Sequence, residues 1–261
     1  MMGLGTAVFW NQPIYKKYRI DGKGKIGGLK IVFLSDLHNT MYGKNQSKLI
    51  AMIDQVAPDL ILMGGDMVDE RSYWGPTKVL LSKLKDRYPM VYITGNHEYW
   101  VEDPEEVHTH FKSCGAQLLL NETCQIETPH GSISVVGLAD PDCDLFNTDK
   151  QTLIKALAET YDATKMTGYK ILLSHRPEHI NVYRQYGVDL VISGHAHGGQ
   201  GRIPFILNGL YAPNQGFFPK YAGGYYLFNE GLEFIIGRGL SYKKKLPRVM
   251  NPPEVVVIEF D

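Results

Sequence analysis

Residues 187–197 read GVDLVISGHAH, an apolar run that ends on two histidines, His195 and His197, one residue apart. A regular β-strand points alternate side chains to the same face, so both imidazoles would lie on one side of the strand end. Such a pair could bind one or two metal ions, or could simply be solvated. The rest of the sequence decides between these two interpretations.

Four other apolar runs also end on polar side chains. They span residues 29–38, 58–70, 88–98 and 169–179, and they end at Asp36 and His38, Asp66, Asn96 and His97, and His175. Continuous Val/Ile/Leu runs are typical of strands buried on both faces. Amphipathic patterns at 45–57, 77–87, 103–115 and 150–162 predict helices between them. In the third, Asp103-Pro104-Glu105 predicts the helix start and Gly115 its end.

The alternation of strands with helices predicts a mostly parallel sheet with right-handed crossovers. Ligands bind such sheets at the carboxyl ends of the strands, which is where every polar cluster lies. We therefore expect these side chains to share one rim. The β-rich stretches 131–140, 223–240 and 253–261, with a hairpin turn at 229–231, fit further strands of the same domain or a second sheet packed on the first.

The overall composition is that of a folded globular protein. The 261 residues are 44% hydrophobic and 21% charged, which argues against disorder. The formal net charge of -1 gives no global basic field, and no nucleic-acid-binding patch is evident. The three cysteines lack CxxC spacing, so they form neither a disulfide framework nor a zinc finger, and they mildly favour a reducing compartment.

The N-terminal region allows two interpretations. We expect residues 1–28 to be an extension with an edge strand at IYKKYRI (14–20), and residues 29–261 to form a single domain. The first residues are too short an apolar run for a signal peptide. Alternatively they are the remnant of a membrane anchor, with Trp10 and Lys16 at the interface. The protein would then be cytoplasmic or peripheral to a membrane, with which it would associate through its N-terminus.

The strand-end side chains have the chemistry of a metal site. Carboxylate, amide and imidazole ligands without thiolate suit divalent ions such as Mn, Fe or Zn. One ion cannot use seven such ligands, whereas two ions that share a carboxylate would use them all. The seven candidates are Asp36, His38, Asp66, Asn96, His175, His195 and His197.

The same residues fall into five ordered motifs. DLH (36–38), GD (65–66), GNHE (95–98), the histidine of LLSHRPE (172–178) and GHAH (194–197) resemble the five blocks of the calcineurin-like metallophosphoesterases. The resemblance implies an α/β fold, a four-layer αββα sandwich with a metal pair at one sheet edge.

The resemblance also implies a role for each residue. The first ion would be bound by Asp36, His38 and His197. The second would be bound by Asn96, His175 and His195, and Asp66 would bridge the two. His97 resembles the catalytic histidine, and Asp69 matches the carboxylate that orients it, although Asp69 could equally be a solvated loop charge.

We therefore expect a phosphoesterase that uses two divalent metal ions. A hydroxide bridging the ions would attack phosphorus in line, and His97 would protonate the leaving group as general acid. The segments 194–226 and 238–261 resemble a bacterial, often membrane-anchored branch of phosphodiesterases that includes enzymes hydrolysing UDP-2,3-diacylglucosamine. A phosphodiester that is nucleotide- or lipid-linked is the favoured substrate. The alternatives are a phosphomonoesterase and a non-catalytic scaffold with the same fold.

Three further segments and Arg176 bear on the substrate. The aromatic stretch 205–226 is a candidate substrate wall, and GFFPKYAGG (216–224) is either a mobile flap or a loop whose Phe217, Phe218 and Tyr221 pack beneath it. Arg176 either binds a phosphate or lies on the surface. The acidic run ADPDCD (139–144) is predicted to form a turn. GRGLSYKKK (237–245) departs from the GLGTS of the similar branch, which leaves any substrate contact there open.

Overall fold

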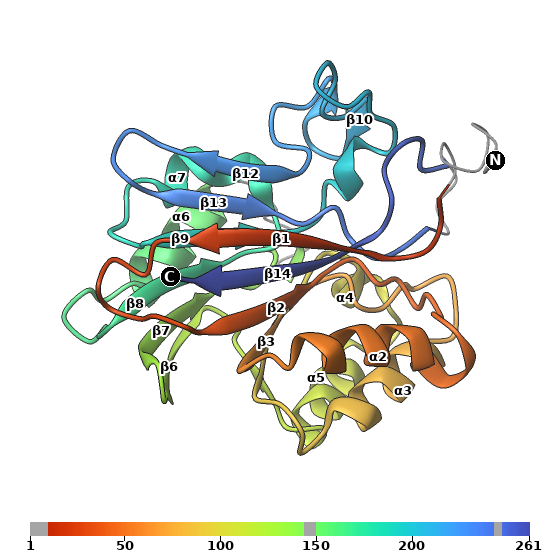
Figure 1. The fold of residues 1–261 in the computed structure, drawn as a ribbon, viewed down its shortest axis with the longest axis horizontal. Helices are drawn as coiled ribbons and strands as arrows, with labels where there is room; N and C mark the ends of the chain where they lie inside the picture. Colours follow the sequence, from red (N-terminus) through yellow and green to blue (C-terminus); the bar gives the residue numbers. More distant parts are fainter. Residues whose placement is uncertain (1–9, 144–149, 243–246) are drawn as a thin grey trace.

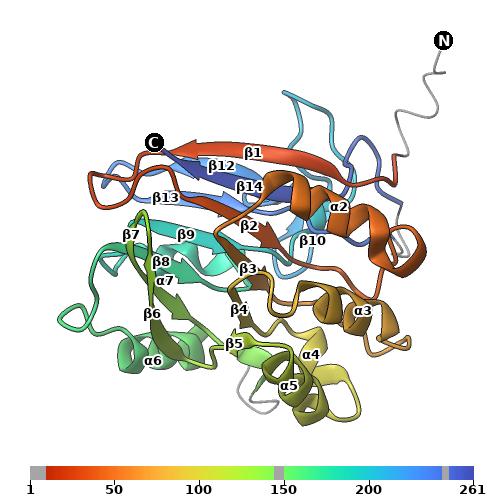
Figure 2. The ribbon, with the colours of Figure 1, turned by 60° about the horizontal axis from the view of Figure 1, so that its bottom comes forward.

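The computed structural model describes residues 10–143, 150–242 and 247–261, and within them two six-stranded sheets face each other (Figures 1 and 2). The first sheet has the order β1-β14-β2-β3-β4-β5, with bounds Ile14–Ile20, Glu254–Phe260, Lys30–Leu34, Leu60–Gly64, Met90–Ile93 and Ala116–Leu118. The second has the order β12-β13-β9-β8-β7-β6, with bounds Gly224–Leu227, Glu233–Ile236, Leu190–Ser193, Tyr169–Leu173, Gly131–Gly137 and Glu122–Thr128. A short ribbon pairs β10 (Tyr211–Ala212) with β11 (Gly216–Phe217).

The five apolar runs divide between the two sheets, which corrects the expectation of one sheet rim. β2, β3 and β4 are parallel neighbours in the first sheet, and β8 and β9 are parallel neighbours in the second. Each sheet has one face toward the other sheet and one toward helices, so strands of both sheets are buried on both faces. The carboxyl ends of the two groups lie at the same end of the sandwich, because Leu240 N–H, beyond β13, donates to Ser35 O beyond β2.

The helices cover the two outer faces. α2 (Ser47–Val56), α3 (Gly75–Leu84) and α5 (Pro104–Ser113) lie on the first sheet, and α6 (Lys150–Thr160) and α7 (Ile180–Tyr183) lie on the second (Figure 2). α5 starts as predicted, since the Asp103 carboxylate accepts the Glu106 N–H at 3.0 Å. Shorter helical turns are α4 (His97–Trp100), η1 (Lys44–Gln46), η2 (Pro141–Cys143), η3 (Pro177–His179) and η4 (His197–Gly199).

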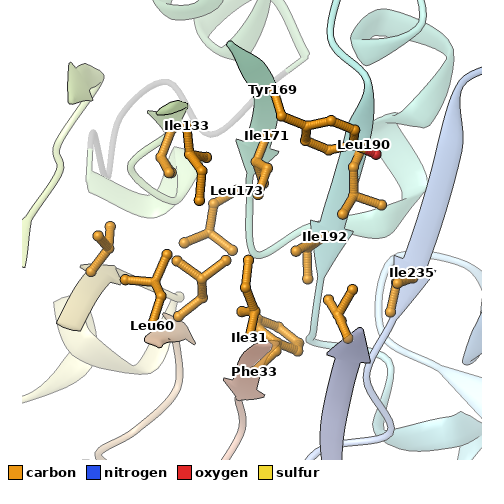
Figure 3. Close-up of a cluster of buried hydrophobic side chains, with 14 of the residues drawn as sticks. Ile31, Phe33, Leu60, Ile133, Tyr169, Ile171, Leu173, Leu190, Ile192 and Ile235 are labelled. Carbon is orange, nitrogen blue, oxygen red and sulfur yellow. The ribbon is translucent and has the colours of Figure 1, made fainter. Parts of the chain in front are cut away.

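Three apolar layers hold this arrangement together. Between the sheets, Ile31 and Phe33 of β2 pack with Ile171 and Leu173 of β8 and with other buried aliphatic side chains (Figure 3). One further layer lies between each sheet and its helices. Helix, sheet, sheet and helix therefore alternate, and the four-layer αββα sandwich is confirmed.

The remaining predictions about the fold have mixed outcomes. β1 pairs in parallel with β14 as the outer strand of the first sheet, as predicted for 14–20. The predicted hairpin joins β12 to β13, with Gly231 at a φ of 79° in its turn. The proposed anchor falls mainly on residues 1–9, outside the described residues, and the division of the chain at residue 28 stays a prediction. None of the described helices is both long enough and apolar enough to cross a membrane.

Candidate metal centre

The structure brings the seven candidate ligands together where the two sheets end. Asp36 and His38 follow β2, Asp66 follows β3, Asn96 follows β4, His175 follows β8, and His195 and His197 follow β9. All seven are buried. Each element thus delivers one or two donors from the point where its strand stops pairing.

The ligand atoms form two clusters that share Asp66. One contains Asp36, His38, Asp66 and His197, and the other Asp66, His175 and His195, with the donor atoms of each cluster within 4.8 Å of one another. Asp66 Oδ2 lies 3.4 Å from His38 Nε2 and 3.2 Å from His175 Nε2. Its other oxygen, Oδ1, accepts a hydrogen bond from the backbone N–H of His97 at 3.0 Å, which fixes the plane of the carboxylate. One carboxylate therefore faces both clusters.

In three of the histidines, the ring nitrogen that points away from the clusters contacts a hydrogen-bond acceptor. The pairs are His175 Nδ1 with Gly64 O at 2.7 Å, His195 Nε2 with Asn214 Oδ1 at 2.9 Å, and His38 Nδ1 with Asp69 Oδ2 at 3.3 Å. The second nitrogen of each ring points into its cluster. Metal-binding histidines are oriented in this way, because the outer hydrogen bond fixes the tautomer and makes the inner nitrogen a better ligand.

The backbone at the site is strained. Five of the seven ligands have positive φ: Asp36 at 52°, His38 at 43°, Asp66 at 52°, His195 at 67° and His197 at 47°. A residue other than glycine costs about 1–3 kcal/mol in such a conformation, and such residues concentrate at functional sites. Folding stability alone would therefore not favour this backbone conformation of the candidate ligands.

Glycines leave the space that this geometry needs. A Cβ on Gly95 would lie 2.3 Å from Asp66 Oδ1, and one on Gly194 would lie 2.7 Å from Asp36 Oδ2. Gly239, in the segment GRGLSYKKK (237–245), packs against Asp36 in the same way. A Cβ on Gly239 would lie 2.6 Å from the Asp36 Cβ. The carboxylates of Asp36 and Asp66 thus pack directly against the backbone of these glycines, where a larger side chain would not fit.

The buried charges fit a cation. Burial acts to raise the pKa of Asp66, but the charges of His175 and His97 outweigh it and hold that pKa well below its usual range. Burial lowers the pKa of His175, but Asp66 outweighs this and raises it to about 10. Burial and the neighbouring His175 charge lower the pKa of His195. Asn96 adds a buried amide oxygen that accepts no hydrogen bond from the described residues. Carboxylate, imidazole and a spare amide oxygen are the donors that a divalent ion would need here.

His97 Nδ1 is hydrogen-bonded to Glu70, whereas Asp69, expected to orient His97, has a carboxylate oxygen within 4.8 Å of a His97 ring nitrogen. His97 Nδ1 lies 2.5 Å from Glu70 Oε2, and His97 Nε2 is 3.9 Å from Asp66 Oδ2. The Asp69 carboxylate instead contacts His38 and accepts two hydrogen bonds from the Arg71 guanidinium at 2.9 and 2.7 Å. Both carboxylates contact Arg71, but Asp69 also contacts the metal-ligand candidate His38, and Glu70 also contacts His97.

Glu98 is a buried residue whose role the sequence analysis missed. Its carboxylate accepts four backbone N–H groups: those of Gly95 at 2.7 Å, Asp66 and Met67 at 2.8 Å, and Val68 at 3.2 Å. It therefore fixes the loops after β3 and β4 relative to each other. Its place in GNHE was the available signal, but neither spacing nor composition gives it a role.

The clusters open onto a cavity of 350 Å³, which His97, Trp100, Arg176, Pro213 and Asn214 help to line. Arg176 is buried, so it is not a surface residue. Its guanidinium donates to Asp140 at 2.8 and 2.7 Å and to Asp142 at 2.8 Å, and these acids belong to the predicted turn, at η2. Asp144 of the same run lies outside the described residues.

The aromatic stretch is divided between the core and the surface. Tyr221 is buried against Tyr226 and Phe234, as one of the two alternatives expected. Phe217 and Phe218 are exposed and lie outside the cavity lining. From this stretch, only the turn residues Pro213 and Asn214 are among those lining the cavity.

Residues 29–199 match the family model described as calcineurin-like phosphoesterase. The chain belongs to this family. Calcineurin-like phosphoesterases are metallophosphoesterases that bind a dinuclear metal centre, and this chain contains buried His/Asp clusters whose donor atoms lie close enough together to hold metal ions.

Similar metallophosphoesterases occur in several bacteria. An uncharacterized metallophosphoesterase of Campylobacter jejuni is 31% identical over 238 residues, which cover 88% of this chain and 58% of the relative. Phosphodiesterase YaeI of Escherichia coli is 30% identical over 243 residues, which cover 91% of this chain and 84% of the relative. The chain spans 58% and 60% of the length of its relatives from Campylobacter jejuni and Helicobacter pylori.

Solved structures share the fold of this chain at low identity. A dimetal phosphatase from Danio rerio has a TM-score of 0.51 at 11% identity, covering 82% of this chain and 88% of that chain. The sulfate thiohydrolase SoxB of Thermus thermophilus has a TM-score of 0.55 at 14% identity, covering 83% and 52%. These matches support the architecture alone.

Proposed function

We propose that the chain hydrolyses phosphate esters, and phosphodiesters in preference to monoesters, with two divalent ions bound at the candidate centre. The observation that carries the proposal is the position of the Asp66 carboxylate, 3.4 Å from His38 and 3.2 Å from His175. A carboxylate between two sets of metal-ligand candidates is the arrangement that a pair of ions requires.

The chain's own residues divide into two ligand sets. Asp36, His38 and His197 would hold one ion and Asn96, His175 and His195 the other, with Asp66 shared. When bound, the ion pair supplies an acidified water and neutralises charge on the phosphoryl oxygens. Mn, Fe and Zn all suit these donors.

His97 would act as the general acid, with Glu70 as its positioning residue. Because Nδ1 is held on Glu70 at 2.5 Å, Nε2 is the nitrogen left to face the reacting group. A positioned imidazole that protonates a departing alkoxide contributes about 10²–10⁴-fold to the rate. In this role His97 would act on the leaving group of the substrate and not on the attacking water.

The charges around the cavity favour a diester. Arg176 is the only lysine or arginine among the described residues that line the cavity, and Asp140 and Asp142 already occupy its guanidinium. A monoester dianion would bring additional negative charge, and the described residues that line the cavity offer it no free lysine or arginine side chain. The similarity to a phosphodiesterase of Escherichia coli over most of both chains points the same way.

Trp100 gives the cavity a flat wall beside His97. Its ring centroid lies 4.6 Å from that of His97, and its indole N–H donates to Asp142 at 3.0 Å. A leaving group that His97 protonates would therefore lie near an aromatic face, which suits a nucleoside or another planar group. The substrates proposed are accordingly nucleotide-linked diesters, with lipid-linked diesters as the second class.

The test compares two esters after metal removal and reloading with Mn²⁺. We expect faster hydrolysis of bis-p-nitrophenyl phosphate than of p-nitrophenyl phosphate. His97→Asn should bind the same amount of metal and lose most turnover of diphenyl phosphate, whose basic phenolate needs a proton to leave. His130→Asn is the matched control, because His130 lies in the turn before β7, at the end of the sheet opposite the site. Preference for the monoester would overturn the diester proposal, and no turnover with two ions bound would favour the scaffold alternative.

A further inference from the structure

Half of the large hydrophobic side chains that are exposed among the described residues lie within one stretch of sixteen residues. They are Ile203, Phe205, Ile206, Leu210, Tyr211, Phe217 and Phe218. Phe205 is fully exposed, and Phe217 and Phe218 are 70% and 67% exposed. Exposed apolar side chains scattered singly need no explanation, but a concentration of this kind marks an interaction surface. We name residues 203–218 the apolar knob.

The apolar knob has a defined backbone. One loop is closed by the Ile203–Leu207 bridge, and the second is the β10–β11 hairpin, in which Tyr211 pairs with Phe217. Leu210 joins the two loops, because its N–H donates to Gly201 O at 2.7 Å and its carbonyl accepts the Phe218 N–H at 2.8 Å. The knob projects beyond the edge strand β12 (Figure 1). The side chains are thus presented outward by a folded projection.

The charges of this region have one sign. The forty residues between Asp189 and Glu230 contain no acidic residue, although the chain holds 28 acidic residues in 261. Arg202 and Lys220 flank the apolar knob, and Lys220 is exposed. Exposed aromatic side chains with basic residues beside them are typical of surfaces that enter the headgroup region of an anionic bilayer.

We propose that the apolar knob is a docking surface for a lipid bilayer, with Phe205, Phe217 and Phe218 inserted among the headgroups. A stable protein interface buries about 800 Å² per partner over a broad, complementary face with a polar rim. The knob instead offers a few side chains on two short loops, with Phe205 in the loop closed by the Ile203–Leu207 bridge and Phe217 and Phe218 at the end of β11. This shape enters a fluid interface more readily than it matches a second protein.

The docking surface is connected to the cavity. The turn of the same hairpin contributes Pro213 and Asn214 to the cavity lining, and Asn214 accepts the hydrogen bond from His195. Insertion of the knob would therefore hold the cavity mouth close to the lipid surface. This inference goes beyond the proposed function. Vesicle binding is measured without turnover, so either the docking surface or the proposed hydrolysis can be refuted without the other.

The test is cosedimentation of the full chain with vesicles of phosphatidylcholine, with and without phosphatidylglycerol. We expect binding that increases with the anionic lipid. The variant Phe205→Ser/Phe217→Ser/Phe218→Ser should bind at least about tenfold more weakly, because each buried phenylalanine ring contributes about that factor or more. Tyr73→Ser/Leu227→Ser is the matched control, because these side chains are 78% and 64% exposed and lie outside the knob. Circular dichroism would verify that both variants are folded.

Two results would overturn the proposal. One is wild-type protein that stays in the supernatant with both vesicle types. The other is a triple variant that binds vesicles as tightly as the wild type does. Sedimentation velocity adds a distinct outcome: dimers that the triple variant abolishes, without vesicle binding, would assign the apolar knob to a second copy of the chain.

Discussion

Replacing Glu70 by glutamine is expected to slow the release of poor leaving groups. The change keeps the size of the side chain but removes the charge that holds His97 Nδ1 at 2.5 Å. A hydrogen bond to a charged group contributes about 1.5–3 kcal/mol. At 1.36 kcal/mol per factor of ten, its loss lowers kcat by about 10- to 150-fold. Glutamine still offers a neutral acceptor, so we expect the lower part of this range.

The assay compares two aryl diesters of similar shape. Bis-p-nitrophenyl phosphate releases a stable anion that leaves without a proton, whereas diphenyl phosphate releases a more basic phenolate that needs one. Glu70→Gln should therefore lose more kcat on diphenyl phosphate, with metal content unchanged. Asp69→Asn is the matched control, because the Asp69 carboxylate contacts His38 and Arg71. It should change metal affinity and affect both esters equally. Equal losses on both esters for Glu70→Gln would refute the assigned roles, as would an ester-selective loss for Asp69→Asn.

Three further predictions concern metal binding and stability. Gly95→Ala should lose metal measured by plasma mass spectrometry, because its Cβ would lie 2.3 Å from Asp66 Oδ1; full metal content would contradict the close packing. In metal-free protein, the pKa of His175 rises from 6.5 to about 10, so its ion pair should stabilise the fold fully below pH 6.5 and be lost as the pH approaches 10. Melting temperatures with and without chelator should show that loss only in chelated protein, and a pH-independent difference would contradict it. Asp140→Ala should lower the free energy of unfolding in urea by about 3 kcal/mol, because it leaves the buried Arg176 short of a partner; a change near zero would count against that pairing.

The elements of the fold could largely be predicted from the sequence, but their assignment to sheets could not. β2 and β8 are equally apolar, because each is covered on both faces, so their sequences do not reveal which sheet they join. Local signals were sufficient where one residue sets the geometry. The Asp103 cap and the turn at Gly231 are of this kind.

The candidate ligands could be predicted because each directly follows a strand, whereas the residues that support them could not. Glu70 and Asp69 are neighbours in an irregular loop, where no period tells which side chain reaches His97. Asn214 meets His195 from a hairpin 19 residues away, and only the folded chain shows that contact. The exposure of the aromatic stretch could not be predicted for the same reason. Tyr221 and Phe218 are aromatic residues of one short segment, but Tyr221 is buried and Phe218 is exposed.

The most direct test of the shared carboxylate is the metal content of Mn²⁺-loaded protein, measured beside its electron paramagnetic resonance spectrum. Wild-type protein should hold two Mn²⁺ ions per chain and show the spectrum of an exchange-coupled pair. Asp66→Asn should lose that coupling and retain one ion at most, with turnover of bis-p-nitrophenyl phosphate lost as well. One uncoupled ion in the wild type, or a coupled pair that persists in Asp66→Asn, would contradict the dinuclear centre proposed here.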